Sequence, residues 1–146
     1  MIYAIGDVHG EAEKLQELLQ VLPLKEGDEF VFLGDYVDRG PDSLGVIETL
    51  LALEQQRPCT FLLGNHESMF LDFLGWTDRY YLGGEAFLAN GGARTLESYG
   101  YSKSMRNVGR KVCLPKAHED FLLRLHLHHR TDDYLFVHAG VVAGND

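Results

Sequence analysis

The sequence predicts an α/β domain with a mixed sheet that is built around a β-α-β-α-β core. Three short, uninterrupted apolar runs at residues 2–5, 30–33 and 61–63 are typical of buried strands in a parallel or mixed sheet. Leucine and isoleucine recur at helical spacing between these runs, so each intervening segment has one apolar face. This alternation of patterns predicts parallel strands joined by right-handed crossovers.

The helices and the remaining strand follow from local patterns. Leucines at i, i+3, i+4 and i+7 predict a first helix near residues 15–22, and a similar repeat predicts a second near residues 44–51. Pro41 and Asp42 are residue types that commonly begin a helix. We expect residues 67–132 to be mostly helical. A fourth apolar run, Leu135–Val137, predicts another buried strand. Glycines predict breaks in the helical region at Gly83-Gly84, Gly91-Gly92 and Gly100.

Composition excludes several classes of function. The 146 residues are 45% hydrophobic and 24% charged, which suits one globular domain over residues 1–146. The net charge of −9 disfavours nucleic acids and anionic membranes as partners. No apolar run approaches the roughly 20 residues of a membrane span, so we expect a cytoplasmic protein. Cys59 and Cys113 are too few for a disulfide framework, and neither lies in the loop of a cysteine phosphatase.

A glycine followed by an oxygen-bearing side chain recurs where each of the first three strands is expected to end. The pairs are Gly6-Asp7, Gly34-Asp35 and Gly64-Asn65. Each interval is the length of one strand plus one crossover. Because the carboxyl ends of parallel strands meet at one edge of a sheet, Asp7, Asp35 and Asn65 should converge. His9 and His138 also lie just beyond predicted strands.

These five residues form a candidate metal site. Mixed oxygen and nitrogen donors suit manganese, iron or zinc better than calcium. Five ligands are too many for one catalytic ion with an open position, but they suit two ions that share a carboxylate. We expect Asp35 to be shared, with Asp7 and His9 on one ion and Asn65 and His138 on the other. A water held by both ions would be the attacking nucleophile. Each cluster alone would more often be an ordinary turn, and only their ordered conjunction favours the metal site.

At these residues the sequence resembles the calcineurin-like metallophosphoesterases, and within them the serine/threonine phosphatases of the phosphoprotein phosphatase family. The segment Gly34–Gly40, GDYVDRG, carries the most specific motif. Residues 90–100 also resemble small bacterial members, so the similarity spans nearly the whole chain. The other three motifs are GDVHG at Gly6–Gly10, GNHE at Gly64–Glu67 and HAG at His138–Gly140.

The resemblance implies the same five metal ligands and adds further roles. His66 would be the general acid that protonates the leaving oxygen, and Asp38 would orient its imidazole. Arg39 would bind the phosphate, with Asn65 as a further substrate contact. The implied mechanism is in-line attack by a hydroxide held between two metal ions, without a phosphoenzyme. The implied ions are manganese first, with iron or zinc as alternatives.

Three activities stay open. The first is hydrolysis of phosphoserine or phosphothreonine in a phosphoprotein or phosphopeptide. The second is a small-molecule activity, like that of a symmetrical dinucleoside tetraphosphatase. The third belongs to another class, a weakly active metal-binding or regulatory protein. Leu63 stands where many members of the family have a basic residue, which weakens the likeness to members that act on proteins.

The family continues beyond its fourth motif to another metal-binding histidine and a second phosphate-binding arginine. This sequence stops at Asp146. We therefore expect a truncated domain that lacks C-terminal strands and one ligand of the second ion. Such a chain could dimerise or exchange segments with a second copy.

Other polar and aromatic residues are given structural roles. The alternating histidines of residues 126–129 suit a partly exposed strand or helix end. His118 is expected near the start of a solvated helix, and Cys59 as a buried small residue. We expect the remaining candidates to lie at the surface or in the core rather than in the site: Arg94, Arg106, Trp76, Tyr80 and Tyr81.

Overall fold

The fold begins with three parallel strands connected by helices, as predicted. The structure is a computed structural model that describes residues 1–76, 83–101, 112–142 and 144. The strands β1 (Ile2–Ile5), β2 (Glu29–Phe32) and β3 (Cys59–Phe61) lie side by side in that order. Helices α1 (Ala12–Val21) and α2 (Ser43–Glu54) form the two crossovers. The predicted β-α-β-α-β core is therefore confirmed.

The register of the sheet brings the ends of the three strands to one edge. Ile5 pairs with Phe32, and Phe32 pairs with Phe61. The loops that follow β1, β2 and β3 consequently begin side by side. Asp42 caps α2, because its carboxylate accepts a hydrogen bond of 2.8 Å from the backbone N–H of Gly45.

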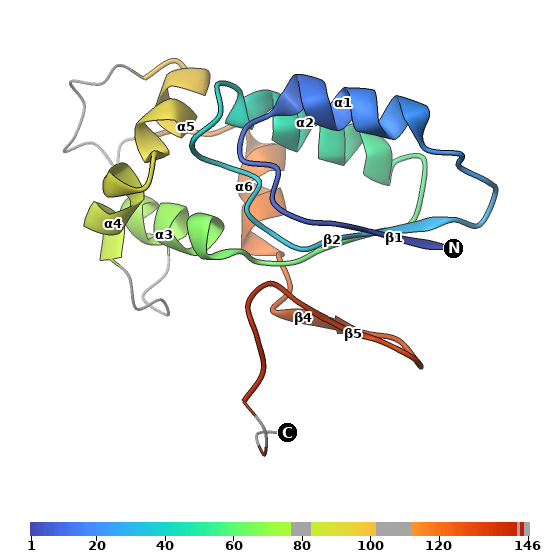
Figure 1. The fold of residues 1–146 in the computed structure, drawn as a ribbon. Coiled ribbons are helices and arrows are strands. Elements are labelled where there is room, and N and C mark those ends of the chain that lie inside the picture. Colours follow the sequence, from blue (N-terminus) through green and yellow to red (C-terminus); the bar gives the residue numbers. More distant parts are fainter. Residues whose placement is uncertain (77–82, 102–111, 143, 145–146) are drawn as a thin grey trace.

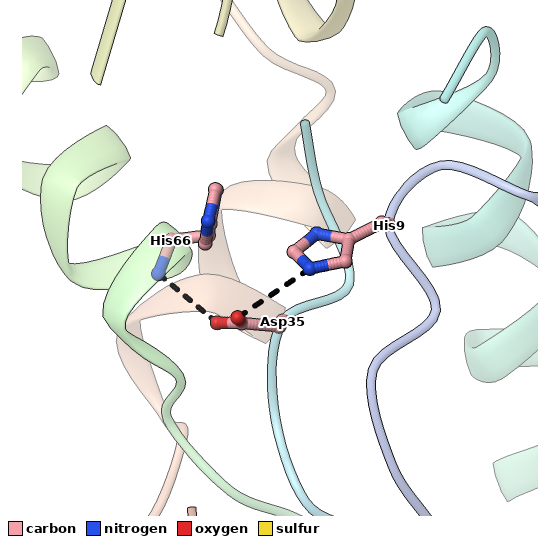
Figure 2. Close-up of side chains that lie close together, drawn as sticks. All are labelled: His9, Asp35 and His66. Carbon is pink, nitrogen blue, oxygen red and sulfur yellow. Dashed lines mark hydrogen bonds and ion pairs between the residues drawn. The ribbon is translucent and has the colours of Figure 1, made fainter. Parts of the chain in front are cut away.

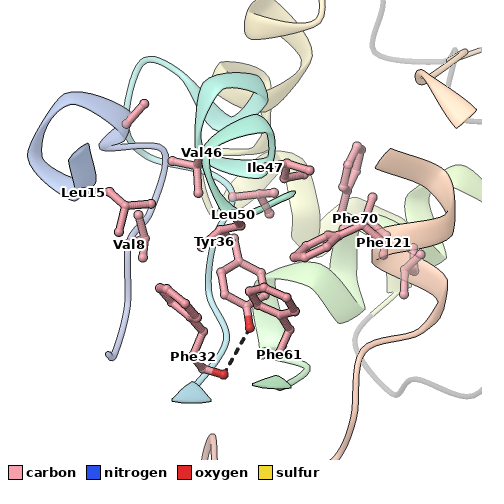
Figure 3. Packing of buried hydrophobic residues seen from close by; sticks show 14 of the residues in the cluster. Val8, Leu15, Phe32, Tyr36, Val46, Ile47, Leu50, Phe61, Phe70 and Phe121 are labelled. Carbon is pink, nitrogen blue, oxygen red and sulfur yellow. Dashed lines mark hydrogen bonds between the residues drawn. The ribbon is translucent and has the colours of Figure 1, made fainter. Parts of the chain in front are cut away.

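Helices α1 and α2 lie together on one side of the sheet (Figure 1). Aromatic side chains from β2 and β3 pack beneath α2 and meet Phe121 of α6 (Figure 3). The rings of Phe61 and Phe121 are 5.0 Å apart in an edge-on contact. Tyr36, in the loop after β2, is fully buried and donates a hydrogen bond of 2.8 Å to the carbonyl of Leu62. This core fixes the two loops that carry the second and third motifs.

The region after β3 is mostly helical in the part that the structure describes, as predicted. Gly91 caps α5 at its N-terminus, and Gly100 lies two residues beyond its last residue. The helices are α3 (Asn65–Leu74), α4 (Gly83–Ala89), α5 (Gly92–Ser98) and α6 (Lys116–Leu123). None of the described helices is long and apolar enough to span a membrane.

The chain after α6 returns to the sheet and then forms a hairpin. The backbone N–H of His126 donates to the carbonyl of Phe61 (3.0 Å), and the carbonyl of His126 accepts from Leu63 (2.7 Å). The hairpin consists of β4 (His128–Arg130) and β5 (Leu135–Val137), paired antiparallel. It lies on the side of the sheet opposite α1 and α2 (Figure 1).

The prediction for Leu135–Val137 was right about the strand and wrong about its surroundings. β5 pairs with β4 in a separate two-stranded sheet, and Leu135 is 49% exposed. A two-stranded hairpin shields little apolar surface, so β5 is not a fully buried strand. β1 is also only partly buried, because it lies at one end of the strand order β1-β2-β3.

His118 lies on the buried face of a helix whose other face is exposed. It lies near the start of α6, as expected, and only 4% of it is exposed. Its Nδ1 is 2.8 Å from the hydroxyl of Tyr99, so α6 is tied to the end of α5. Burial lowers the pKa of His118.

Candidate active site

The loop after β1 is held on the loop after β2 by backbone hydrogen bonds. The carbonyl of Asp35 accepts from the N–H groups of Val8 (3.0 Å) and His9 (2.9 Å). The carbonyl of Tyr36 accepts from Gly10 at 2.8 Å. These contacts fix the first motif against the second independently of the side chains that carry the chemistry.

The loops after β2 and β3 approach each other closely because both contain glycine. A Cβ atom at Gly34 would lie 2.6 Å from the backbone nitrogen of Gly64, closer than side chains tolerate. A Cβ at Gly64 would collide with the backbone and carboxylate of Asp35. The two glycines thus allow Asp35 and Asn65 to lie together.

Glu67 joins the second and third motifs at their backbones. Its carboxylate is fully buried and accepts hydrogen bonds from the N–H groups of Asp35 (2.8 Å), Tyr36 (2.7 Å), Val37 (3.1 Å) and Gly64 (3.1 Å). Burial, together with the negative charge of Asp35, raises the pKa of Glu67 to about 7, while the N–H donors act in the opposite direction. One side chain therefore fixes the conformation of the loop that carries Asp35.

Four residues that are not glycine have a positive φ in the described part of the chain. They are His9 (45°), Asp35 (56°), Asp38 (72°) and Arg39 (68°). The left-handed region is unfavourable for such residues, and it persists only where surrounding contacts impose it. All four were predicted as site residues, so the backbone strain coincides with the candidate site.

His9 and Asp35 form the first group of candidate ligands. His9 Nε2 lies 3.7 Å from one oxygen of Asp35 and 3.6 Å from an oxygen of Asp7. Figure 2 shows the Asp35 carboxylate between the imidazole of His9 and the backbone nitrogen of His66. Donor atoms of His9, Asp35 and His66 all lie within 4.8 Å of one another, which is a distance that one cation can span.

His138 completes a second group that also contains Asp35. Its Nε2 is 3.4 Å from Asp35 Oδ1 and 2.9 Å from Asn65 Oδ1. Donor atoms of Asp7, Asp35 and His138 again lie within 4.8 Å of one another. The two groups share Asp35, which is the residue predicted to bridge.

The other ring nitrogen of each histidine has an acceptor of its own. His9 Nδ1 is 3.0 Å from the carbonyl of Val37, and His138 Nδ1 is 2.8 Å from the carbonyl of Leu33. A carbonyl can only accept, so Nδ1 carries the hydrogen and, in the neutral imidazole, Nε2 presents a lone pair to the carboxylates. Ring N–H groups bonded to fixed acceptors are the usual arrangement around metal-binding histidines.

Asp38 and His66 form a buried pair beside the first group. His66 Nδ1 is 2.7 Å from Asp38 Oδ2, and both side chains are almost fully inaccessible. Burial raises the pKa of Asp38 against the effect of its hydrogen bonds. For His66, burial lowers the pKa, but the Asp38 hydrogen bond and the Asp35 charge outweigh it, and the pKa is raised. Asp38 therefore holds the His66 ring through Nδ1, and Nε2 faces the site.

Arg39 lies over the edge of both imidazoles. Its guanidinium nitrogens are 3.1 Å from His9 Nε2 and 3.2 Å from His66 Nε2. The side chain is exposed on its other side. A planar cation in this position can reach an anion bound in front of the two histidines.

The structure thus brings every predicted site residue into one neighbourhood. They contribute the donor groups, the buried pair and the exposed guanidinium: Asp7, His9, Asp35, Asp38, Arg39, Asn65, His66 and His138. Sequence reasoning missed the roles of Glu67 and Thr95. An acidic residue three positions after the N-cap residue, here Gly64, is a capping signal that could have identified Glu67. No local signal identifies Thr95, whose hydroxyl contacts Asp38 from 57 residues away.

The residues assigned to structural roles lie elsewhere. Arg94 is exposed and pairs with Glu97, and Trp76 packs against the core. Cys59 is partly buried. The histidines of residues 126–129 belong to neither of the two donor groups found in the described residues. Tyr80, Tyr81 and Arg106 lie outside the described residues.

This chain belongs to the calcineurin-like phosphoesterase family. The model of that family matches residues 1–142. The resemblance inferred from the four motifs is confirmed, and with it the assignment to the metallophosphoesterases. The α/β fold class is confirmed as well.

Two relatives of this chain are described as bis(5'-nucleosyl)-tetraphosphatases. The chain is 30% identical over 146 residues to the asymmetrical bis(5'-nucleosyl)-tetraphosphatase of Oceanobacillus iheyensis, with 94% of this chain and 55% of the relative covered. It is 42% identical over 73 residues to the symmetrical enzyme of Legionella pneumophila strain Lens, with 49% of this chain and 26% of the relative covered. The chain spans about half the length, or less, of these relatives.

Solved structures share the fold. A proposed diadenosine tetraphosphatase superposes with a TM-score of 0.66 at 24% identity, over 99% of this chain and 52% of that one. A metallophosphoesterase from Sphaerobacter thermophilus gives a TM-score of 0.54 at 20% identity, over 92% of this chain and 44% of that one.

Proposed function

We propose that this chain carries the metal-binding and acid–base residues of a phosphoesterase that hydrolyses dinucleoside tetraphosphates. The observation that carries the proposal is that Nε2 of His9 and Nε2 of His138 both face the carboxylate of Asp35, at 3.7 Å and 3.4 Å. Imidazole and carboxylate donors arranged in this way can hold two cations that share Asp35.

The donor set suits the ions that were expected. Asp7, His9 and Asp35 would hold one ion, and Asp35, Asn65 and His138 the other. Mixed carboxylate, amide and imidazole ligation is compatible with manganese, iron or zinc. Ions bound there would supply Lewis-acid chemistry and lower the pKa of a coordinated water.

His66 and Asp38 handle the proton in this proposal. Asp38 fixes the ring of His66 through Nδ1, which leaves Nε2 directed at the site. His66 would donate a proton from Nε2 to the oxygen that leaves phosphorus. Arg39 would turn its guanidinium from the imidazoles to the phosphate, where a planar fork can bind two oxygens.

The relatives support a small-molecule substrate better than a phosphoprotein. Both named relatives are bis(5'-nucleosyl)-tetraphosphatases. Dinucleoside tetraphosphate hydrolysis, the alternative among the predicted activities, is therefore favoured over phosphoserine and phosphothreonine hydrolysis. Such a substrate would be met in the cytoplasm, where we place the protein.

A direct comparison of substrates tests the proposal. The purified chain, loaded with Mn²⁺, is incubated with diadenosine tetraphosphate or with a phosphoserine peptide, and the products are separated by ion-exchange chromatography. We expect kcat/KM to be at least roughly tenfold higher for the dinucleotide. ADP alone would indicate symmetrical cleavage, whereas ATP with AMP would indicate asymmetrical cleavage. Faster turnover of the peptide, or no hydrolysis of either substrate, would contradict the proposal.

A further inference from the structure

Two hydroxyl groups surround Asp38 on the side away from His66. Thr95 Oγ1 donates a hydrogen bond of 2.6 Å to Asp38 Oδ1. The backbone N–H of Asp38 faces Thr95 Oγ1 at 2.9 Å and Ser43 Oγ at 3.1 Å. Thr95 is fully buried, as are Asp38 and Ser43.

The number of available hydrogens gives this network a direction. Thr95 has one hydroxyl hydrogen, and Asp38 Oδ1 uses it. The contact of 3.0 Å between Ser43 Oγ and Thr95 Oγ1 must then be donated by Ser43. The bonds consequently run from Ser43 to Thr95 to Asp38, while His66 donates to the other oxygen of the same carboxylate.

Helix α5, which carries Thr95, is fixed against the second motif. Gly91 precedes α5 with a φ of 99°, and a Cβ atom there would lie 3.0 Å from the backbone nitrogen of Arg39. Ser98 Oγ accepts from the N–H of Leu44 at 3.2 Å. The position of Thr95 is therefore fixed by the contact of Gly91 with Arg39 at one end of α5 and by the contact of Ser98 with α2 at the other end.

We propose that Thr95 is a positioning residue, whose hydroxyl fixes the Asp38 carboxylate so that His66 keeps its orientation and tautomer. A carboxylate that accepts hydrogen bonds at both oxygens is held in one orientation. The role in turnover rests on the proposed function, because it acts through His66. The role in orienting the Asp38–His66 pair does not, and it can be measured without any substrate.

The first measurement is the proton NMR resonance of the His66 Nδ1 hydrogen in the protein without substrate, with His66→Asn used for its assignment. Thr95→Val keeps the shape of the side chain and removes the hydroxyl, whereas Thr95→Ser keeps the hydroxyl. We expect the resonance to change position or broaden in Thr95→Val and to stay as in the wild type in Thr95→Ser. An unchanged resonance in Thr95→Val, or equal changes in both variants, would overturn the proposal. If Thr95→Val does not fold, Thr95→Ala takes its place.

The second measurement separates the chemical step from binding. In Thr95→Val we expect kcat for phenyl phosphate, which has a poor leaving group, to fall at least roughly tenfold. KM should change little, because Thr95 does not contact the substrate. Turnover of p-nitrophenyl phosphate should also change little, because its good leaving group needs no general acid. Thr95→Ser should restore kcat. Equal losses on both substrates, or no rescue by serine, would contradict the role.

Thr49→Val is the matched control. Thr49 also donates its hydroxyl to a neighbour, the carbonyl of Gly45 at 2.8 Å, but on α2 and outside the site. Its removal should leave the His66 resonance and both rates unchanged. A wild-type chain without any phosphoesterase activity would refute the proposed function, and the NMR comparison would still decide the role of Thr95.

Discussion

The loops after β1, β2 and β3 and the β4–β5 hairpin contribute to the same site in different ways. The loops are joined by backbone hydrogen bonds and by Glu67, and Asp35, Asp38 and His66 are buried among them. The hairpin brings His138, which is held by one backbone carbonyl and one exposed amide. Leu135 and Tyr134 of the hairpin are 49% and 64% exposed.

The two candidate ion sites therefore differ in how the surrounding structure supports them. The group with His9 is formed within one packed core, so its geometry exists whether or not an ion binds. The group with His138 depends on contact between the core and a separate two-stranded sheet. A substitution in the loops should therefore change both stability and metal affinity. A substitution in the hairpin should change metal affinity with little effect on stability.

Asp35→Asn should have the largest effect, because both donor groups share this carboxylate. Asparagine has the same shape but lacks the charge that attracts two cations. We expect the bound metal to fall well below two equivalents and hydrolysis to drop by roughly 10³-fold or more. Metal analysis after dialysis and a steady-state assay measure the two effects. Retention of two ions would mean that Asp35 is not shared.

Glu67→Gln should destabilise the core without touching a ligand directly. The glutamine amide places N–H donors opposite backbone N–H donors, which leaves buried groups unsatisfied. We expect the free energy of unfolding to fall by about 3 kcal/mol. Urea denaturation measures it. Glu17→Gln, on the exposed side of α1, is the control and should change little. Equal stability of the two variants would show that Glu67 does not hold the loops together.

His66→Asn distinguishes a general acid from a metal ligand. Since His66 can also be counted in the first donor group, both roles are geometrically possible. We expect near-normal metal content and a loss of about 10²-fold in turnover of esters with poor leaving groups. Turnover of p-nitrophenyl phosphate should fall less. Loss of one ion would identify His66 as a ligand, and unchanged turnover would remove it from the acid role.

His138→Ala should have the smallest effect on stability and a selective effect on metal binding. The side chain is 16% exposed and contacts the core at the Leu33 carbonyl and at Asn65 Oδ1, so we expect the free energy of unfolding without metal to fall by no more than about 2 kcal/mol. Equilibrium dialysis should show one tight ion retained and the second weakened. Loss of both ions would make the hairpin integral to the whole site and remove the contrast with the loops.

The parts of the site that follow strands could be predicted from the sequence. Asp7, Asp35 and Asn65 converge because parallel strands in register end together, and apolar runs identify such strands. The predicted break at Gly91-Gly92 also identified the N-terminus of α5. The partner of a strand could not be predicted in this way, because the apolar run at Leu135–Val137 does not indicate which segment pairs with it.

Long-range side-chain contacts account for most of what sequence reasoning missed. Glu67 fits an ordinary helix start, and only the fold reveals that it binds the loop after β2. Thr95 and His118 have no periodicity that marks them as buried. Thr95 contacts Asp38, and His118 contacts Tyr99, because of the way α5 and α6 pack, and no local sequence pattern predicts that packing.

The left-handed backbone at His9, Asp35, Asp38 and Arg39 has a consequence for protein engineering. Glycine or asparagine adopts that conformation more easily, so at the exposed Arg39 such a replacement should raise thermal tolerance while removing the chemistry. At Asp35 and Asp38 a glycine would also leave buried hydrogen-bond donors unsatisfied. A directed-evolution campaign that selects only for heat resistance would drift toward such replacements. Libraries built on this scaffold should keep these four codons fixed.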